Sequence, residues 1–271
     1  MNRAAGPVLE LRGVGLTFPD GTRALRGLSL RLSPGEFVSV VGPSGCGKST
    51  LLRIASGLCR PAEGGAENRA ARTGYVFQDP TLLPWRSVRR NVELLGELHR
   101  LPRAERQRRA GAAIHRVGLG EFARHRPAAL SGGMRMRASL ARALTLDPDL
   151  FLLDEPFGAL DELTRERLTE QLHDLFTADG FAALLVTHSI GEAVHLSSRV
   201  IVLSDRPGTV TAEVAVPFPY PRSPGLRFSA EFGAMAARVS AALRGERDPA
   251  AAAGGRGPRR RAGGGDRLEA V

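Results

Sequence analysis

The sequence predicts an α/β fold built around a mostly parallel sheet. Short, continuous apolar segments recur along the chain, and segments of this kind are typical of strands buried on both faces. They lie at residues 37–41, 75–77, 150–154, 183–187 and 200–203. The segments between them look helical, and this alternation of strands and helices predicts parallel pairing. A glycine-rich turn at 42–47 joins the first of the central strands to a helix at 48–58.

Three other segments depart from this alternation. Apolar residues alternate at 8–18 and 25–32, which predicts two half-buried strands ahead of the core. Residues 88–126 are rich in arginine and favour helix, so we expect an inserted helical lobe there. After Gly245 the chain is rich in Gly, Ala and Arg and poor in apolar bulk, which predicts a disordered tail without a function of its own.

The composition is that of a globular protein with an anionic partner. Of the 271 residues 42% are hydrophobic, and no apolar run reaches the length of a membrane span or a secretory signal, so we expect folding in the cytoplasm. Cys46 and Cys59 show neither a disulfide nor a zinc pattern.

The net charge of +10 is concentrated in residues 85–127, with eleven Arg against four acidic residues, and in the segment from Arg244 onward.

The turn after the first central strand predicts a phosphate-binding loop. Residues 42–49 read GPSGCGKS, and Lys48 is the only lysine among 38 Lys and Arg residues. The loop pattern, G-x-x-x-x-G-K-S between a strand and a helix, lets backbone N–H groups converge on phosphates at a helix N-terminus. A compact ammonium can thread such a loop, whereas a planar guanidinium would clash with it. A tight glycine turn at a helix start is the alternative. The loop residues expected to hold the nucleotide are Gly42, Pro43, Ser44, Gly45, Cys46, Gly47, Lys48, Ser49 and Thr50.

A pair of acidic residues supports the same site. The apolar strand in LFLLDEP (150–156) ends at Asp154, which places a carboxylate at the sheet edge that also carries the loop. There Asp154 could hold Mg²⁺ through water together with the Ser49 hydroxyl, and Glu155 could activate a water as general base. The alternative is that the two acids only precede a helix cap.

The segment LSGGM (130–134), taken with these motifs, resembles the signature of the nucleotide-binding subunits of ABC transporters. The resemblance covers the chain from about Leu9 to Pro219. It implies a P-loop NTPase core with a mostly parallel sheet, an N-terminal antiparallel β subdomain and an inserted α-helical subdomain at about 86–145. It also implies one ATPase domain over residues 1–244, followed by the basic tail 245–271.

The resemblance also implies roles for single residues. Ser131, Gly132 and Gly133 would contact the ATP bound by the opposite subunit of a homodimer. Gln78 in YVFQDP would contact Mg²⁺ and the attacking water, and His188 in LLVTHS would contact the γ-phosphate, although a lone histidine at a strand end is more often a core residue. Asp161 would lie in the loop that crosses the dimer interface. Phe18 would stack on adenine, or instead be a core strand residue.

Within the family, DPTLLPW, DEPFGALDELTR and VIVLSDRPG look like importers of the nitrate, sulfonate and taurine type, and relatives that import pyrimidine precursors share these traits. The resemblance implies ATP and Mg²⁺ as cofactors, two transmembrane permease subunits, an extracytoplasmic solute-binding protein, and a place at the cytoplasmic face of the membrane. In two respects the chain departs from the pattern: Met136 stands where Gln is common, and the segment between Gly57 and Gln78 is short.

Three other functions remain as alternatives. A nucleic-acid-associated ABC ATPase would fit the basic charge, but such proteins carry paired cassettes, coiled coils or zinc modules, so no specific nucleic acid is expected. A module that binds nucleotide without hydrolysis would not need Glu155 and His188. A small-molecule kinase would explain Lys48 but not the signature, Gln78 or His188.

Overall fold

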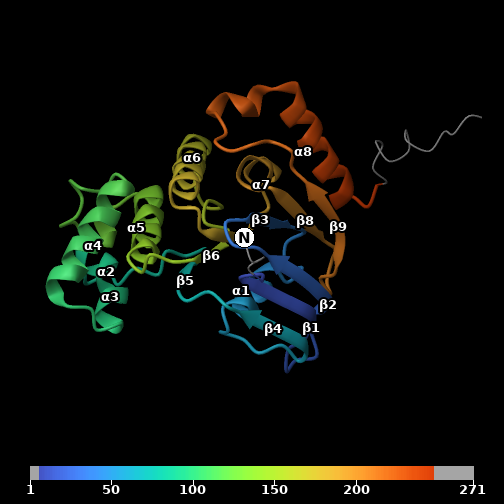
Figure 1. Ribbon diagram of the computed structural model, residues 1–271, viewed down its shortest axis with the longest axis horizontal. Helices are drawn as coiled ribbons and strands as arrows, with labels where there is room; N and C mark the ends of the chain where they lie inside the picture. Colours follow the sequence, from blue (N-terminus) through green and yellow to red (C-terminus); the bar gives the residue numbers. More distant parts are fainter. Residues whose placement is uncertain (1–5, 247–271) are drawn as a thin grey trace, which may run out of the picture.

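The computed structural model describes residues 6–246, and its core is a six-stranded sheet (Figure 1). The strand order is β5-β6-β7-β3-β8-β9, in which β9 is antiparallel to β8 and the other pairs are parallel. The sequence correctly predicted a mostly parallel sheet; β9 was not predicted. The bounds are β3 (Phe37–Val41), β5 (Thr73–Val76), β6 (Leu150–Asp154), β7 (Ala182–Val186), β8 (Arg199–Leu203) and β9 (Val210–Ala215).

A second, antiparallel sheet lies beside the core and has the order β2-β1-β4. Its strands are β1 (Leu9–Thr17), β2 (Arg23–Leu32) and β4 (Glu63–Asn68). The sequence did not predict β4, because EGGAEN lacks alternating apolar residues. The reason for its glycines is steric. Gly64 has φ +74°, and a Cβ there would lie 2.2 Å from the carbonyl oxygen of Arg12 on β1.

Helices cover both faces of the core sheet. The helix after the glycine loop, α1 (Lys48–Ala55), packs with the antiparallel sheet on one face, against Val38 and Val40. It is shorter than predicted. On the other face α6 (Glu162–Asp179) packs against Phe37 and Phe151. Near β8, α7 (Ile190–Leu196) and α8 (Ala230–Leu243) form a third cluster, reached through a 3₁₀ turn at Pro224–Phe228.

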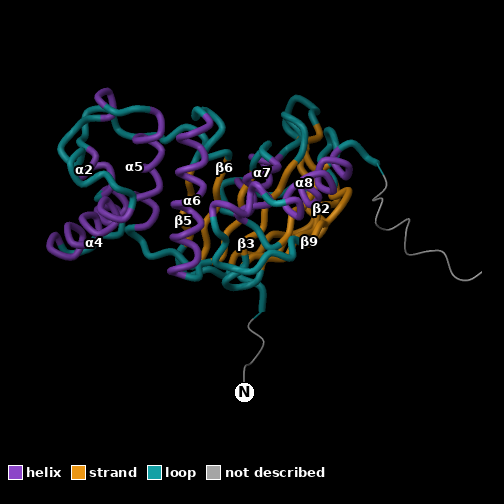
Figure 2. The backbone as a smooth tube through the Cα atoms, turned by 90° about the horizontal axis from the view of Figure 1, so that it is seen from above, coloured by secondary structure: helices purple, strands orange, loops and turns teal. Residues whose placement is uncertain are grey.

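The arginine-rich segment 88–126 and the helix that follows it form the helical lobe that the sequence predicted. Figures 1 and 2 show this lobe at one end of the molecule, with β9 and α8 at the other end. Its helices are α2 (Val88–Val92), α3 (Leu94–Leu98), α4 (Arg103–Arg116) and α5 (Gly132–Leu144). Several arginines pair with acids of the same lobe, as Arg86 does with Glu97 at 2.7 Å and Arg109 with Glu105 at 2.6 Å. Some of the lobe's arginines are therefore paired locally, but the excess of arginine over acidic residues leaves the lobe basic.

No helix within residues 6–246 combines the length and the apolar character needed to cross a bilayer. The tail for which disorder was predicted lies, from residue 247 onward, outside the described residues.

His195, at the end of α7, should make stability depend on pH. It is fully buried, and burial lowers its pKa to about 3, with nearby Arg227, His173 and Arg222 acting in the same direction. Below the unfolded pKa of about 6.5 the unfolded chain binds a proton that the folded chain excludes, so stability is lost as pH falls from about 6.5 toward 3. We expect the titration of His195 to lower the free energy of unfolding by about 1.4 kcal/mol between pH 7.5 and pH 5.5. Urea unfolding at both pH values, with His195→Gln as the control without a titrating ring, measures this difference; equal losses in both proteins would contradict it.

Candidate active site

The glycine loop between β3 and α1 is shaped by close approaches that leave no room for side chains. Gly45 and Gly47 have positive φ, and a Cβ on Gly47 would lie 2.8 Å from the carbonyl oxygen of Ala24. A Cβ on Gly42 would lie 2.9 Å from Cys46 Sγ, and the Cys46 side chain itself is buried. The loop therefore presents backbone rather than side chains at the N-terminus of α1, a geometry that binds phosphate.

Lys48, the only lysine, is almost completely buried in this loop. Its Nζ donates to the carbonyl oxygens of Gly42 at 2.9 Å and Pro43 at 3.0 Å, and lies 3.7 Å from Glu155 Oε1. A buried charge is tolerated only when it is paired and hydrogen-bonded, and here backbone carbonyls and one carboxylate meet that need. The space between these partners suits the three donors of a small ammonium.

Ser49 and Asp154 lie together, as the sequence predicted for a cation site. Ser49 Oγ donates to Asp154 Oδ1 at 2.9 Å, and the Tyr75 hydroxyl donates to Asp154 Oδ2 at 3.5 Å. Burial raises the pKa of Asp154, while the Ser49 hydrogen bond opposes the shift. Sequence reasoning missed Tyr75. Tyr75 lies on β5, which pairs with β6, and it is in register with Leu152. The sequence alone did not show that these two strands pair, so it did not place Tyr75 near Asp154.

Glu155 and His188 also meet, although they are far apart in the sequence. His188 Nδ1 lies 3.1 Å from Glu155 Oε2. Glu155 has a left-handed backbone with φ +42°, which is rare for a residue with a side chain and is held by its N–H donating to the Val186 carbonyl at 2.9 Å. His188 is half exposed, so it is not the core histidine that was the alternative.

A cavity of about 310 Å³ opens above the loop. Phe18 stands at its rim, beyond the end of β1 and 38% exposed, which excludes the alternative that it is a core strand residue. Sequence reasoning missed Arg206, whose guanidinium donates to the Gly45 carbonyl at 2.9 and 2.7 Å. Its position just after a buried strand was the available signal. The residues that line the cavity include Phe18, Ser44, Gly45, Gly47, Lys48, Ser49, Thr50, Gln78, Glu155 and Arg206.

The signature residues lie elsewhere, beside a separate cavity of about 160 Å³ that Ser131 and Gly133 line. Ser131 caps α5 by accepting from the Met134 N–H, and Gly132 and Gly133 open that helix. Asp161 caps α6 by accepting from the Thr164 N–H at 3.0 Å, which lowers its pKa. The chain thus keeps two potential anion sites apart. Met136 packs in the core, so its side chain replaces no exposed polar contact.

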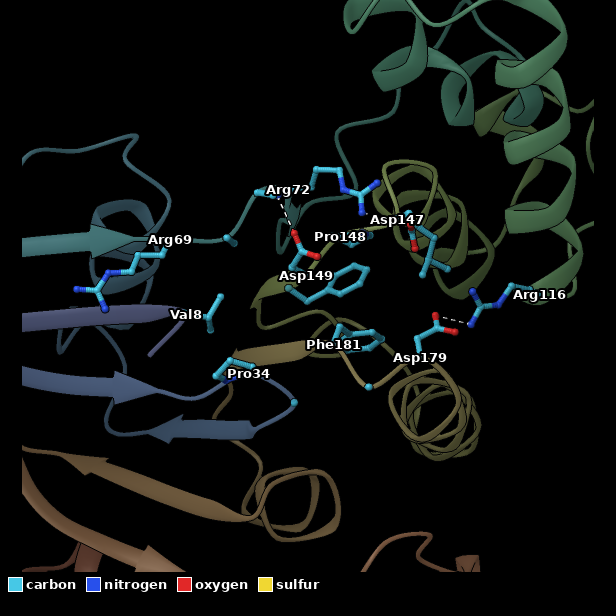
Figure 3. A pocket seen from close by; sticks show the side chains of 16 residues that line it. Val8, Pro34, Arg69, Arg72, Arg116, Asp147, Pro148, Asp149, Asp179 and Phe181 are labelled. Atoms are coloured by element: carbon cyan, nitrogen blue, oxygen red, sulfur yellow. Dashed lines mark hydrogen bonds and ion pairs between the residues drawn. The ribbon is translucent and has the colours of Figure 1, made fainter. Parts of the chain in front are cut away.

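Another cavity, of about 510 Å³, contains none of the predicted residues (Figure 3). It lies where the parallel strands begin, next to Phe151 and Phe181, and ion pairs such as Arg116 with Asp179 at 2.7 Å surround it. In open α/β sheets ligands bind at the carboxyl ends of the strands. We therefore place the active site at the Lys48 loop despite the smaller volume there.

The residues around Lys48 fit a nucleoside triphosphate with a divalent cation. The loop supplies backbone groups at its glycines and one ammonium for phosphates, and Ser49 and Asp154 supply the hydroxyl and carboxylate oxygens that Mg²⁺ prefers. The site and the fold define a P-loop nucleoside triphosphatase.

Comparison with known proteins gives the family. The family described as "ABC transporter" matches residues 25–158. The Aliphatic sulfonates import ATP-binding protein SsuB 1 of Xanthomonas axonopodis pv. citri is 46% identical over 223 residues, covering 79% of this chain and 88% of that protein. The Nitrate import ATP-binding protein NrtC of Synechocystis is 43% identical over 230 residues, covering 80% of this chain and 34% of that protein.

A solved dimeric structure of MJ0796, a bacterial ABC transporter cassette, superposes with a TM-score of 0.70 at 35% identity, covering 78% of this chain and all of that one. The chain belongs to the ABC transporter family. It has the ABC ATPase fold that the sequence predicted, and it is an ATP-binding ATPase subunit of that family.

The glycine loop provides a matched pair of variants. Gly47→Ala combines positive φ with a clash against the Ala24 carbonyl, whereas Gly57→Ala, just after α1, has positive φ and open space. We expect each to cost about 1–3 kcal/mol of stability from backbone strain. Only Gly47→Ala should displace the loop and weaken ATP binding, by roughly tenfold or more. Calorimetric titration with ATP measures this; unchanged affinity in Gly47→Ala would contradict the steric account.

Proposed function

We propose that this chain powers the import of a small anionic or zwitterionic solute, of the nitrate, sulfonate or taurine type, or of another small organic molecule such as a pyrimidine precursor. The proposal of ATP hydrolysis is supported by one observation: four residues meet at the carboxyl edge of the sheet, namely Lys48, Asp154, Glu155 and His188. The relatives named as import proteins for aliphatic sulfonates and nitrate support the solute class.

In the proposed reaction, Lys48 and the loop from Gly42 to Thr50 bind the triphosphate, with Phe18 against the adenine. Glu155 takes a proton from a water that attacks the γ-phosphorus, the bond to the β–γ bridging oxygen breaks, and ADP and phosphate are the products. His188, in contact with Glu155, orients that carboxylate and the γ-phosphate. Mg²⁺ held by Ser49, Asp154 and Gln78 would neutralise charge on the phosphates.

The separation of the two anion sites favours a homodimer as the working unit. Ser131 and Gly133 line a different cavity from the one that Lys48 lines, which favours contact with a different nucleotide. Two chains facing each other could place each signature on the partner's ATP, with the Asp161 loop at the interface. The dimeric cassette, and a related structure described as a post-hydrolysis state with ADP and Pi, support this arrangement.

The partners follow from the same proposal. The ATPase domain spans residues 1–244, and its helical subdomain, at about 86–145, meets two transmembrane permease subunits at the cytoplasmic face of the membrane. An extracytoplasmic solute-binding protein completes the system. Uncompensated arginines of the lobe could contact acidic permease residues or lipid headgroups, at about 1 kcal/mol per charge near a lipid surface.

Two variants test the proposed chemistry. Glu155→Gln removes the general base but keeps the nucleotide site, so we expect kcat for ATP hydrolysis to fall by about 100-fold or more and a dimer to persist with bound ATP. Lys48→Ala removes the buried cation, so ATP binding and the dimer should both be lost. Light scattering with and without millimolar ATP and Mg²⁺ measures the dimer. A Glu155→Gln protein that stays monomeric under these conditions would rule out the proposed mechanism.

A further inference from the structure

Glu192, on α7, is a buried carboxylate just behind the His188 turn. It is 5% exposed, and its Oε2 accepts from Thr187 Oγ1 at 2.5 Å. Thr187 Oγ1 in turn accepts from the Ser189 N–H at 3.0 Å. Thr187 and Ser189, on the two sides of His188, are therefore both connected to the Glu192 carboxylate. Thr187 bonds to it directly, and Ser189 is connected through the Thr187 hydroxyl.

Arg165, on α6, connects that carboxylate to a second loop. Its Nε lies 3.6 Å from Glu192 Oε1, and its Nη2 donates to the Leu160 carbonyl at 2.9 Å. Its Nε is also 3.5 Å from the Phe157 carbonyl. These carbonyls belong to residues 156–161, the loop that runs from Glu155 to Asp161. Gly158 of this loop approaches His188 closely, since a Cβ there would lie 3.4 Å from His188 Cε1.

Stability alone does not explain such a pair. A buried ion pair is often no better than a well-packed apolar pair, because both charges must leave water. Burial does raise the pKa of Glu192, with the Thr187 hydrogen bond and the charges of Arg165 and Arg227 opposing the shift. Glu192 is instead bonded to the turn that carries His188, and Arg165 to the loop that directly follows Glu155.

We propose that Arg165 and Glu192 are positioning residues that couple the 156–161 loop to the turn carrying His188, so that His188 faces Glu155 when the loop is correctly placed. The inference rests on the proposed roles of Glu155 and His188. Because Asp161 lies at the proposed dimer interface, this buried bridge would pass the arrival of the partner subunit to the hydrolytic site.

A double-mutant cycle on the full chain tests the coupling. Glu192→Gln and Arg165→Gln should each lower kcat by about 2- to 30-fold with little change in KM for ATP. The double variant should be no slower than the slower single variant, because either change already breaks the bridge. Thr187→Val should resemble Glu192→Gln, and Thr187→Ser, which keeps the hydroxyl, should retain kcat.

The matched control is Asp179→Asn, which breaks an ion pair with Arg116 at the far end of the same helix α6 (Figure 3). It should leave kcat within about twofold. All rates are taken below the melting temperature of each variant, measured by circular dichroism, so that a loss of folded protein is separated from a loss of kcat. Independent, multiplying losses in the cycle, or equal losses in Asp179→Asn, would overturn the coupling.

A second readout separates this inference from the proposed function. In a Glu155→Gln background the Glu192→Gln change should still permit the ATP-bound dimer, because the bridge acts on hydrolysis rather than on binding. A wild-type chain without ATPase activity would remove the proposed function and this inference together. An active wild type with an inactive Glu155→Gln variant and a fully active Glu192→Gln variant would remove this inference alone.

Discussion

The buried ammonium of Lys48 is the interaction on which the rest of the site depends. The loop carbonyls of Gly42 and Pro43 and the carboxylate of Glu155 surround one positive charge, which links the end of β3 to the end of β6. This network satisfies the charge before a nucleotide arrives, and an incoming triphosphate can replace the carboxylate as its partner. In the proposed mechanism the Glu155 carboxylate would then be available to a water, and nucleotide binding would be connected to the proposed base through the same cation.

The parallel sheet brings together the residues around Lys48. Central strands end at one edge, so Lys48 and Glu155 line a single cavity although they are far apart in the chain. Asp154 and His188 contact two residues that line it, Ser49 and Glu155. The signature residues Ser131 and Gly133, at the start of α5, line another cavity. If the proposed site is divided between these two surfaces, the division gives a physical reason for a dimer. The Arg165–Glu192 pair then connects the proposed interface loop with the proposed hydrolytic groups.

Local sequence patterns were enough to predict most of the strands and the glycine loop, but not the contacts set by packing. β3 and β6 were predicted with their observed bounds, because short continuous apolar runs in such a fold form the strands buried in the sheet. β4 was missed, since its glycines are selected by a close backbone approach at Gly64 and not by an apolar pattern. Arg206 and Glu192 act through partners distant in sequence, and no spacing rule indicates such pairs. The position of Met136 in the core could be seen only in the structure.

The most direct test of the central claim is the ATP affinity of Lys48→Arg, measured by isothermal titration calorimetry with a folded protein confirmed by circular dichroism. The substitution keeps the charge and changes only its shape. If the loop carbonyls define a space for a compact ammonium, the planar guanidinium cannot occupy it, and affinity should fall by roughly 100-fold, about 2.7 kcal/mol. ATP affinity equal to that of the wild type would show that the site requires only a positive charge, and would contradict the account.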